Sequence, residues 1–137
     1  MHRFRYKKVI LVAPDIFPKQ LTTELNYVRH IADINLLFPT IFEDKPGVII
    51  FDYDFIGNNL EKNIRRIKCN KFYENVKVIC YKSKQNEKID SFLKAIGVDD
   101  IIYNQDLDKK GKNKNLILQI AAAIASPISK LVGIETN

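Results

Sequence analysis

Two short segments of the chain are apolar at nearly every position, and both stop abruptly at polar or turn residues. One covers residues 8–13 and stops at Pro14 and Asp15, and the other covers Val48–Phe51 and stops at Asp52. Continuous apolar runs of this length, rich in β-branched residues, are typical of strands that are buried on both faces of a parallel sheet. The pattern therefore predicts two central parallel strands.

Weaker strand patterns occupy residues 27–32, 76–81 and 100–103, and the first of these is the least regular. Between the strands, apolar residues recur at helical spacing. The clearest helix carries Ile89, Phe92, Leu93 and Ile96, and we expect it to end at Gly97. The other predicted helices cover residues 18–26, residues 34–42, the segment through Leu60, Ile64 and Ile67, and residues 116–125.

The order of these elements predicts one α/β domain. Strands that alternate with helices form a parallel sheet, here of five strands, with helices on both faces. The 137 residues fit a single domain, with a core at about 8–125 and a C-terminal tail at 126–137. In the helix at 34–42, we expect Asp33 to cap the first turn and Pro39 to remove a hydrogen bond or bend the helix.

Composition narrows the class of protein. With 46% hydrophobic and 28% charged residues the chain has the balance of a globular protein, and no apolar run approaches the roughly 20 residues of a membrane helix. Residues 9–13 are too short for the core of a signal peptide. We therefore expect a cytoplasmic protein without membrane contact, in which Cys69 and Cys80 are free thiols and the two histidines form no metal site.

The net charge of +6 raises the alternative of a nucleic-acid partner. Nine basic residues face only three acidic ones between Leu60 and Lys88, and further clusters lie near each end of the chain. However, the sequence has neither aromatic–basic repeats nor zinc-finger spacing. We expect the basic side of the predicted third helix (Lys62, Arg65, Arg66 and Lys68) to be ordinary solvent-facing charge, and we keep a nucleic-acid-binding α/β module only as an alternative.

Three segments carry a family resemblance. The segments 45–52, 76–79 and 95–102 are similar to the phosphoacceptor strand, the following strand and the turn into the last strand of response-regulator receiver domains, the CheY-like family of two-component systems. The resemblance covers about residues 8–125. It implies a flavodoxin-like, doubly wound sheet with strand order 2-1-3-4-5, whose first and third strands end together at the ligand-binding edge.

The resemblance also implies a phosphorylation site. An active receiver accepts a phosphoryl group from a histidine kinase on one aspartate. The transfer requires Mg²⁺ held by an acid pair after the first strand, a hydroxyl after the fourth strand and a lysine after the fifth, because the reacting groups are anions. Asp52 matches the phosphoacceptor. The protein is therefore identified as a receiver that keeps its central aspartate.

The other functional positions are substituted. The acid pair falls on Ala13 and Pro14, the hydroxyl position on Lys82 with Ser83 one residue later, and the lysine position on Asn104. The resemblance thus implies a degenerate receiver. Lys82 either pairs with Asp52, which would hold the loops in one state without phosphate, or points into solvent.

Two alternatives concern metal and contact surfaces. Asp15 and Asp54 would join Asp52 as substitute Mg²⁺ ligands, or Asp15 starts a turn and Asp54 is a solvated loop residue. The last predicted helix is apolar around more than one face. Its residues Leu116, Ile117 and Ile120 would therefore form a docking or dimer surface, or simply cover the sheet.

Together these features predict a stand-alone receiver-like signalling domain rather than an enzyme. We expect it to act without phosphorylation or cofactor, through contact with a histidine kinase, another regulator or a second copy of itself. The first alternative is a phosphorelay receiver that is phosphorylated on Asp52 with atypical Mg²⁺ ligands. The second is the nucleic-acid-binding module.

Overall fold

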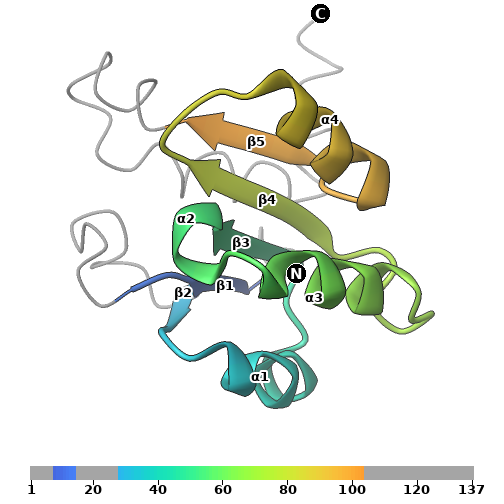
Figure 1. Ribbon diagram of the computed structural model, residues 1–137. Coiled ribbons are helices and arrows are strands. Elements are labelled where there is room, and N and C mark those ends of the chain that lie inside the picture. Colours follow the sequence, from blue (N-terminus) through green and yellow to red (C-terminus); the bar gives the residue numbers. More distant parts are fainter. Residues whose placement is uncertain (1–7, 15–27, 104–137) are drawn as a thin grey trace, which may run out of the picture.

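The computed structural model describes residues 8–14 and 28–103 of the chain, and these residues form a parallel five-stranded sheet (Figure 1). The strand order is β2-β1-β3-β4-β5, as predicted, and every neighbouring pair is parallel. The strands are β1 (Val9–Val12), β2 (Val28–Ile31), β3 (Val48–Asp52), β4 (Lys77–Lys82) and β5 (Asp100–Tyr103). The sheet therefore has the flavodoxin-like topology that the sequence predicted.

The described helices pack on one face of this sheet, as the residues of the larger core cluster show. They are a 3₁₀ turn (Ile34–Leu36), α1 (Leu37–Asp44), α2 (Tyr53–Ile56), α3 (Asn59–Lys68) and α4 (Glu87–Ile96). The helices predicted at residues 18–26 and 116–125 lie outside the described residues, and so does the tail. No helix within the described ranges is long and apolar enough to span a membrane.

The buried residues follow the two patterns seen in the sequence, which are the continuous apolar runs of the central strands and the helical spacing of apolar residues in α3 and α4. All residues of β1 and β3 are buried, and these two strands lie in the middle of the sheet between other strands. On α3, Leu60, Ile64 and Ile67 are buried against the sheet, as their spacing predicted. On α4 the prediction holds for Leu93 and Ile96, but 43% of Phe92 remains exposed.

Two helix ends show where local sequence signals succeed and fail. Gly97 ends α4 with φ of 126°, as predicted. The helix predicted over 34–42 is instead a 3₁₀ turn, capped by Asp33, followed by α1. Pro39 consequently lies in the first turn of α1, where a backbone amide has no partner within the helix. At this position Pro39 removes no hydrogen bond from α1, so the expected loss of a bond inside the helix does not occur.

Candidate functional site

The carboxyl ends of the strands bring Ala13, Asp52, Lys82 and Tyr103 to one edge of the sheet. Asp52 is the last residue of β3 and the N-cap of α2, where its Oδ1 accepts a hydrogen bond from the Phe55 amide at 3.2 Å. The residue is 9% exposed. Burial raises the pKa of the Asp52 carboxyl, the Phe55 amide opposes this shift, and the nearby charge of Asp54 adds to it.

At the two positions where an active receiver carries its acid pair, this chain has no side chain that can bind a metal ion. Ala13 is fully buried, and its carbonyl oxygen lies 2.9 Å from Nε2 of His30 on β2. Pro14 follows it directly. The edge of the sheet beside Asp52 thus offers a methyl group and a proline ring where a divalent ion would need carboxylate oxygens.

Lys82 occupies the buried end of β4, and only 3% of it is exposed. Its Nζ lies 2.6 Å from Oδ1 of Asp90 on α4 and 4.9 Å from the centre of the Tyr53 ring. The Tyr103 hydroxyl donates a hydrogen bond to the other oxygen of Asp90. We call Lys82, Asp90 and Tyr103 the Lys82 network; together with Tyr53 it joins α2, β4, α4 and β5.

The Lys82 network keeps Asp90 ionised. Burial by itself raises the pKa of the Asp90 carboxyl. The hydrogen bonds from Lys82, Tyr103 and the Asn86 amide outweigh burial, so the pKa lies below its ordinary value. A carboxylate and an ammonium are therefore both present in a shielded place, and each supplies the other's counter-charge.

The hypothesis that Lys82 pairs with Asp52 is wrong, and so is its alternative of a lysine in solvent. Successive side chains of a strand point to opposite faces of the sheet. Asp52 is in register with Tyr81, so Lys82 belongs to the other face, where it meets Tyr53 and α4. Tyr103 is in register with Lys82 on the neighbouring strand. Sequence analysis missed Asp90 as the partner of Lys82 and Tyr103 as the second partner of Asp90, although Tyr103 ends a predicted strand at the same edge.

The described residues at this edge form no complete ligand set for a divalent cation. Among the described residues no three His, Cys, Asp or Glu side chains come together as a ligand set. In the same part of the chain, every buried side-chain nitrogen or oxygen already has a hydrogen-bond partner. Asp54 is exposed. The third predicted ligand, Asp15, lies outside the described residues, as do Asn104 and the predicted contact residues Leu116, Ile117 and Ile120.

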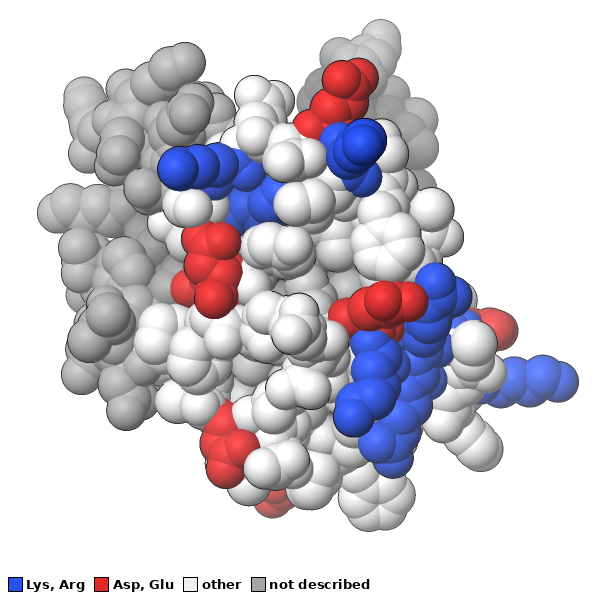
Figure 2. Space-filling model, in the orientation of Figure 1, with Lys and Arg blue, Asp and Glu red and all other residues white. Residues whose placement is uncertain are grey.

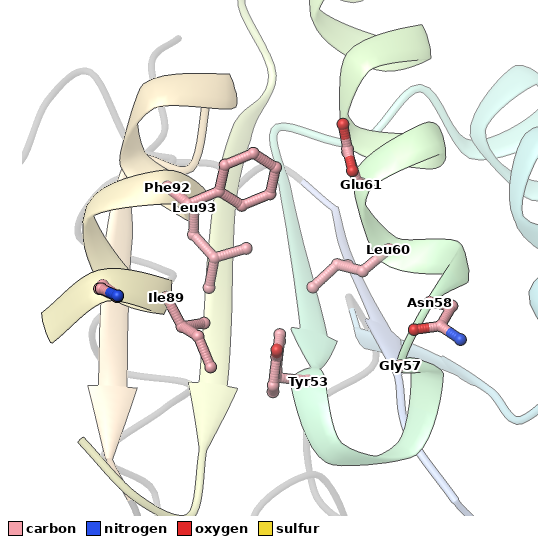
Figure 3. A pocket seen from close by; sticks show the side chains of 9 residues that line it. Tyr53, Gly57, Asn58, Leu60, Glu61, Ile89, Phe92 and Leu93 are labelled. Atoms are coloured by element: carbon pink, nitrogen blue, oxygen red, sulfur yellow. The ribbon is translucent and has the colours of Figure 1, made fainter. Parts of the chain in front are cut away.

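A surface pocket of about 270 Å³ lies beside the Lys82 network, between α2, α3 and α4 (Figure 3). Its walls are mainly apolar and are formed by Tyr53, Leu60, Ile89, Phe92 and Leu93. Tyr53 takes part in both features, since its ring also contacts Lys82. A molecule in this pocket would therefore touch α4 and the residue that follows Asp52.

Figure 2 shows Lys and Arg side chains gathered on one part of the surface, and three of the four basic residues on α3 have partners within the protein. Arg65 pairs with Glu61 at 2.9 Å, and the guanidinium of Arg66 lies 4.0 Å from the centre of the Phe38 ring. Lys68 binds both the Val76 carbonyl and Asp99, each at 3.0 Å. A polyanion would therefore compete with these partners for the cations of α3, and the expectation of ordinary surface charge stays a prediction.

Comparison with solved structures gives the fold a family context. No protein-family model matches the chain, and no curated protein matches it. The phosphorylated cyanobacterial phytochrome response regulator RcpA is 16% identical, with 88% of this chain and 91% of that chain covered and a TM-score of 0.62. This protein has the fold of a response-regulator receiver domain.

Two further receivers support this assignment of the fold. The Mn²⁺-bound form of the response regulator Rcp1 is 17% identical, with 81% of this chain and 91% of that chain covered and a TM-score of 0.59. The receiver domain of a DNA-binding response regulator from Colwellia psychrerythraea 34H is 19% identical, with coverages of 77% and 95% and a TM-score of 0.57. At such identities the likeness concerns the fold and leaves the chemistry to be argued from the site.

Proposed function

We propose that this protein is a receiver-like signalling domain that acts by protein–protein contact without phosphorylation of Asp52. The observation that carries the proposal is the buried ion pair between Lys82 and Asp90. An active receiver needs a hydroxyl at the position of Lys82 for the phosphoryl group. An ammonium that is already paired with a carboxylate supports a site that keeps one state without phosphate.

The surroundings of Asp52 support the same proposal. Phosphoryl transfer to a carboxylate brings anions together and depends on a cation between them. Ala13 and Pro14 have no side chain that could bind that cation, and burial raises the pKa of the Asp52 carboxyl, which has no positive partner among the described residues. The partners we propose are a histidine kinase or another regulator. The pocket beside Tyr53 is where such a partner would contact both α4 and the Asp52 loop.

A beryllofluoride titration followed by amide NMR tests the proposal, because this anion mimics the phosphoryl group on a receiver aspartate. With Mg²⁺ and beryllofluoride together, we expect the amide signals of Asp52, Tyr53 and Lys82 to stay where they are with Mg²⁺ alone. The matched control is Asp52→Asn, which cannot bind the mimic. Saturable shifts in the wild type that are lost in Asp52→Asn would instead establish a phosphorelay receiver with atypical Mg²⁺ ligands.

Nucleic-acid binding remains the proposal of lower rank. It rests on the net charge of +6, whereas three of the four basic residues on α3 have partners within the protein. Retention on immobilised DNA that falls steeply with salt concentration would support it.

A further inference from the structure

The end of the sheet opposite Asp52 carries a large apolar groove. It lies between the end of α1 and the loop that leads from α3 into β4, and its volume is about 680 Å³. The apolar side chains that line it are Ile41, Phe42, Pro46, Phe72, Tyr73 and Val76. Because β3 and β4 begin here and end at the Asp52 edge, this groove is separate from the candidate site.

Two phenylalanines of the groove are unusually exposed. Phe42 is 74% exposed and Phe72 is 90% exposed, whereas Phe55 and Phe92 elsewhere on the surface are 41% and 43% exposed. Exposed apolar area costs free energy in water, at about 25 cal/mol per Å². Single exposed side chains are common, but two aromatic rings beside an apolar groove form the kind of patch that marks an interaction surface.

The charges around the groove narrow the choice of occupant. Lys45 lines the groove, Lys71 precedes Phe72 in the chain, and Glu43 and Glu74 follow Phe42 and Tyr73. Asp44, Lys77 and Lys8, whose carbonyl accepts from the Gly47 amide, also adjoin the lining residues. Both signs therefore occur around the groove in similar number, although the chain as a whole carries +6. A polyanion or an anionic lipid surface would require an excess of lysine and arginine. A balanced rim can instead meet its own copy, as a two-fold interface requires.

We propose that this groove binds a second copy of the chain, with Phe42 and Phe72 of each copy packed against the groove of the other. Phenylalanine buries about 150–250 Å² when it is covered, so four rings would supply roughly half of the 1,200–2,000 Å² of a standard stable interface. The groove walls and the rim would supply the remainder. Such a dimer leaves the Asp52 edge accessible, and it holds whether or not Asp52 is phosphorylated.

Sedimentation velocity of the full chain over a wide concentration range tests the proposal. We expect a monomer–dimer equilibrium, and we expect Phe72→Ala and Phe42→Ala each to raise the dimer dissociation constant by about thirtyfold or more. Phe55→Ala is the matched control, since it removes a phenylalanine of α2 that is 41% exposed and lines neither the groove nor the pocket beside Tyr53, so it should leave the equilibrium unchanged. Circular dichroism verifies that each variant is folded.

Two results would overturn the proposal. One is a wild-type chain that stays monomeric at the highest concentration reached; binding of an apolar peptide or of lipid vesicles by that monomer would assign the groove to another occupant. The other is a dimer that neither phenylalanine variant weakens. A dilution series of amide spectra of the wild type gives an independent check, because the concentration-dependent shifts must map to the groove and not to α4.

Discussion

At the scale of single residues, buried Asp52 and partly buried Asp90 have opposite electrostatics. Asp52 has no positive partner among the described residues, so burial disfavours its charge. Asp90 holds an ammonium and a tyrosine hydroxyl, so its charge is favoured despite burial. The counter-charge of Lys82 is thus Asp90 on α4 and not Asp52 at the phosphoacceptor position.

The raised pKa of Asp52 predicts that Asp52→Asn stabilises the fold near neutral pH. Protonated Asp52 contributes to the free energy of unfolding, and this contribution is fully present below the unfolded pKa of about 4 and is lost as pH rises through the folded pKa. Asparagine has no charge to bury and therefore avoids this loss. Asparagine also keeps the oxygen that accepts from Phe55. Urea unfolding at several pH values should show a gain that shrinks towards pH 4. A loss at pH 7 would indicate a cation bound beside the carboxylate.

The exposed Asp33 provides a matched control for that comparison. It also caps a helical turn through its side chain, and asparagine caps equally well. Asp33→Asn should therefore leave the free energy of unfolding nearly unchanged at pH 7.

Removing the negative charge of Asp90 should be costly. Asp90→Asn leaves the ammonium of Lys82 buried without a counter-charge, and breaking a buried pair in this way costs about 3–5 kcal/mol. Glu61→Gln, which breaks the exposed pair with Arg65, should cost at most about 1 kcal/mol. Chemical denaturation at pH 7 measures both, and equal small losses would show that the Lys82 network contributes no more than a surface pair.

Acid should reduce the effect of Asp90→Asn. Since the folded pKa of Asp90 is lowered, its stabilisation is present above the unfolded pKa and is lost as pH falls through the folded pKa. The difference between wild type and Asp90→Asn should therefore shrink as the medium becomes strongly acidic.

At the scale of elements, α4 is held at both ends. Asn86 caps its first turn, and the Lys82 network ties that end to β4 and β5. At the other end, Asp99 binds both Lys68 of α3 and the Val78 amide of β4. The turn between α4 and β5 is therefore fixed by contacts with two other elements.

Gly97→Ala tests the importance of the turn between α4 and β5. Gly97 has φ of 126°, and a Cβ there would lie 2.6 Å from Cγ of Lys68. We expect a loss of about 1–3 kcal/mol from backbone strain, with a further loss as Lys68 is displaced from Asp99. Gly57→Ala is the control, because φ is 61° there but no atom lies within 4 Å of the added carbon. Equal losses for the two variants in thermal unfolding would show that the contact with Lys68 is unimportant.

At the scale of the whole molecule, the parallel sheet separates two surfaces. The Asp52 edge lies at the carboxyl ends of the strands, and the apolar groove lies at their amino ends. A strand of five residues such as β3 spans about 16 Å, so substitutions at the two ends should act independently. The proposed contact with signalling partners and the proposed pairing of copies are therefore compatible within one fold.

Much of the fold was predictable because its signals are local. The runs in β1 and β3, the spacing in α3 and the glycine after α4 each follow from a period or a turn preference within a few residues. The position of Asp52 at the edge of the sheet then follows from the order of the elements. The predictions at Asp15, Asn104 and the last helix stay predictions, because they fall outside the described residues.

The sequence by itself determined a five-stranded α/β sheet that carries an aspartate at its carboxyl edge and no acid pair beside it. Only the tertiary structure decided what Lys82 binds, that Phe92 stays half exposed, and that Phe42 and Phe72 flank one groove. These features depend on register between strands and on contacts between residues far apart in the chain. The face that a side chain meets is settled only when neighbouring strands and helices are in place.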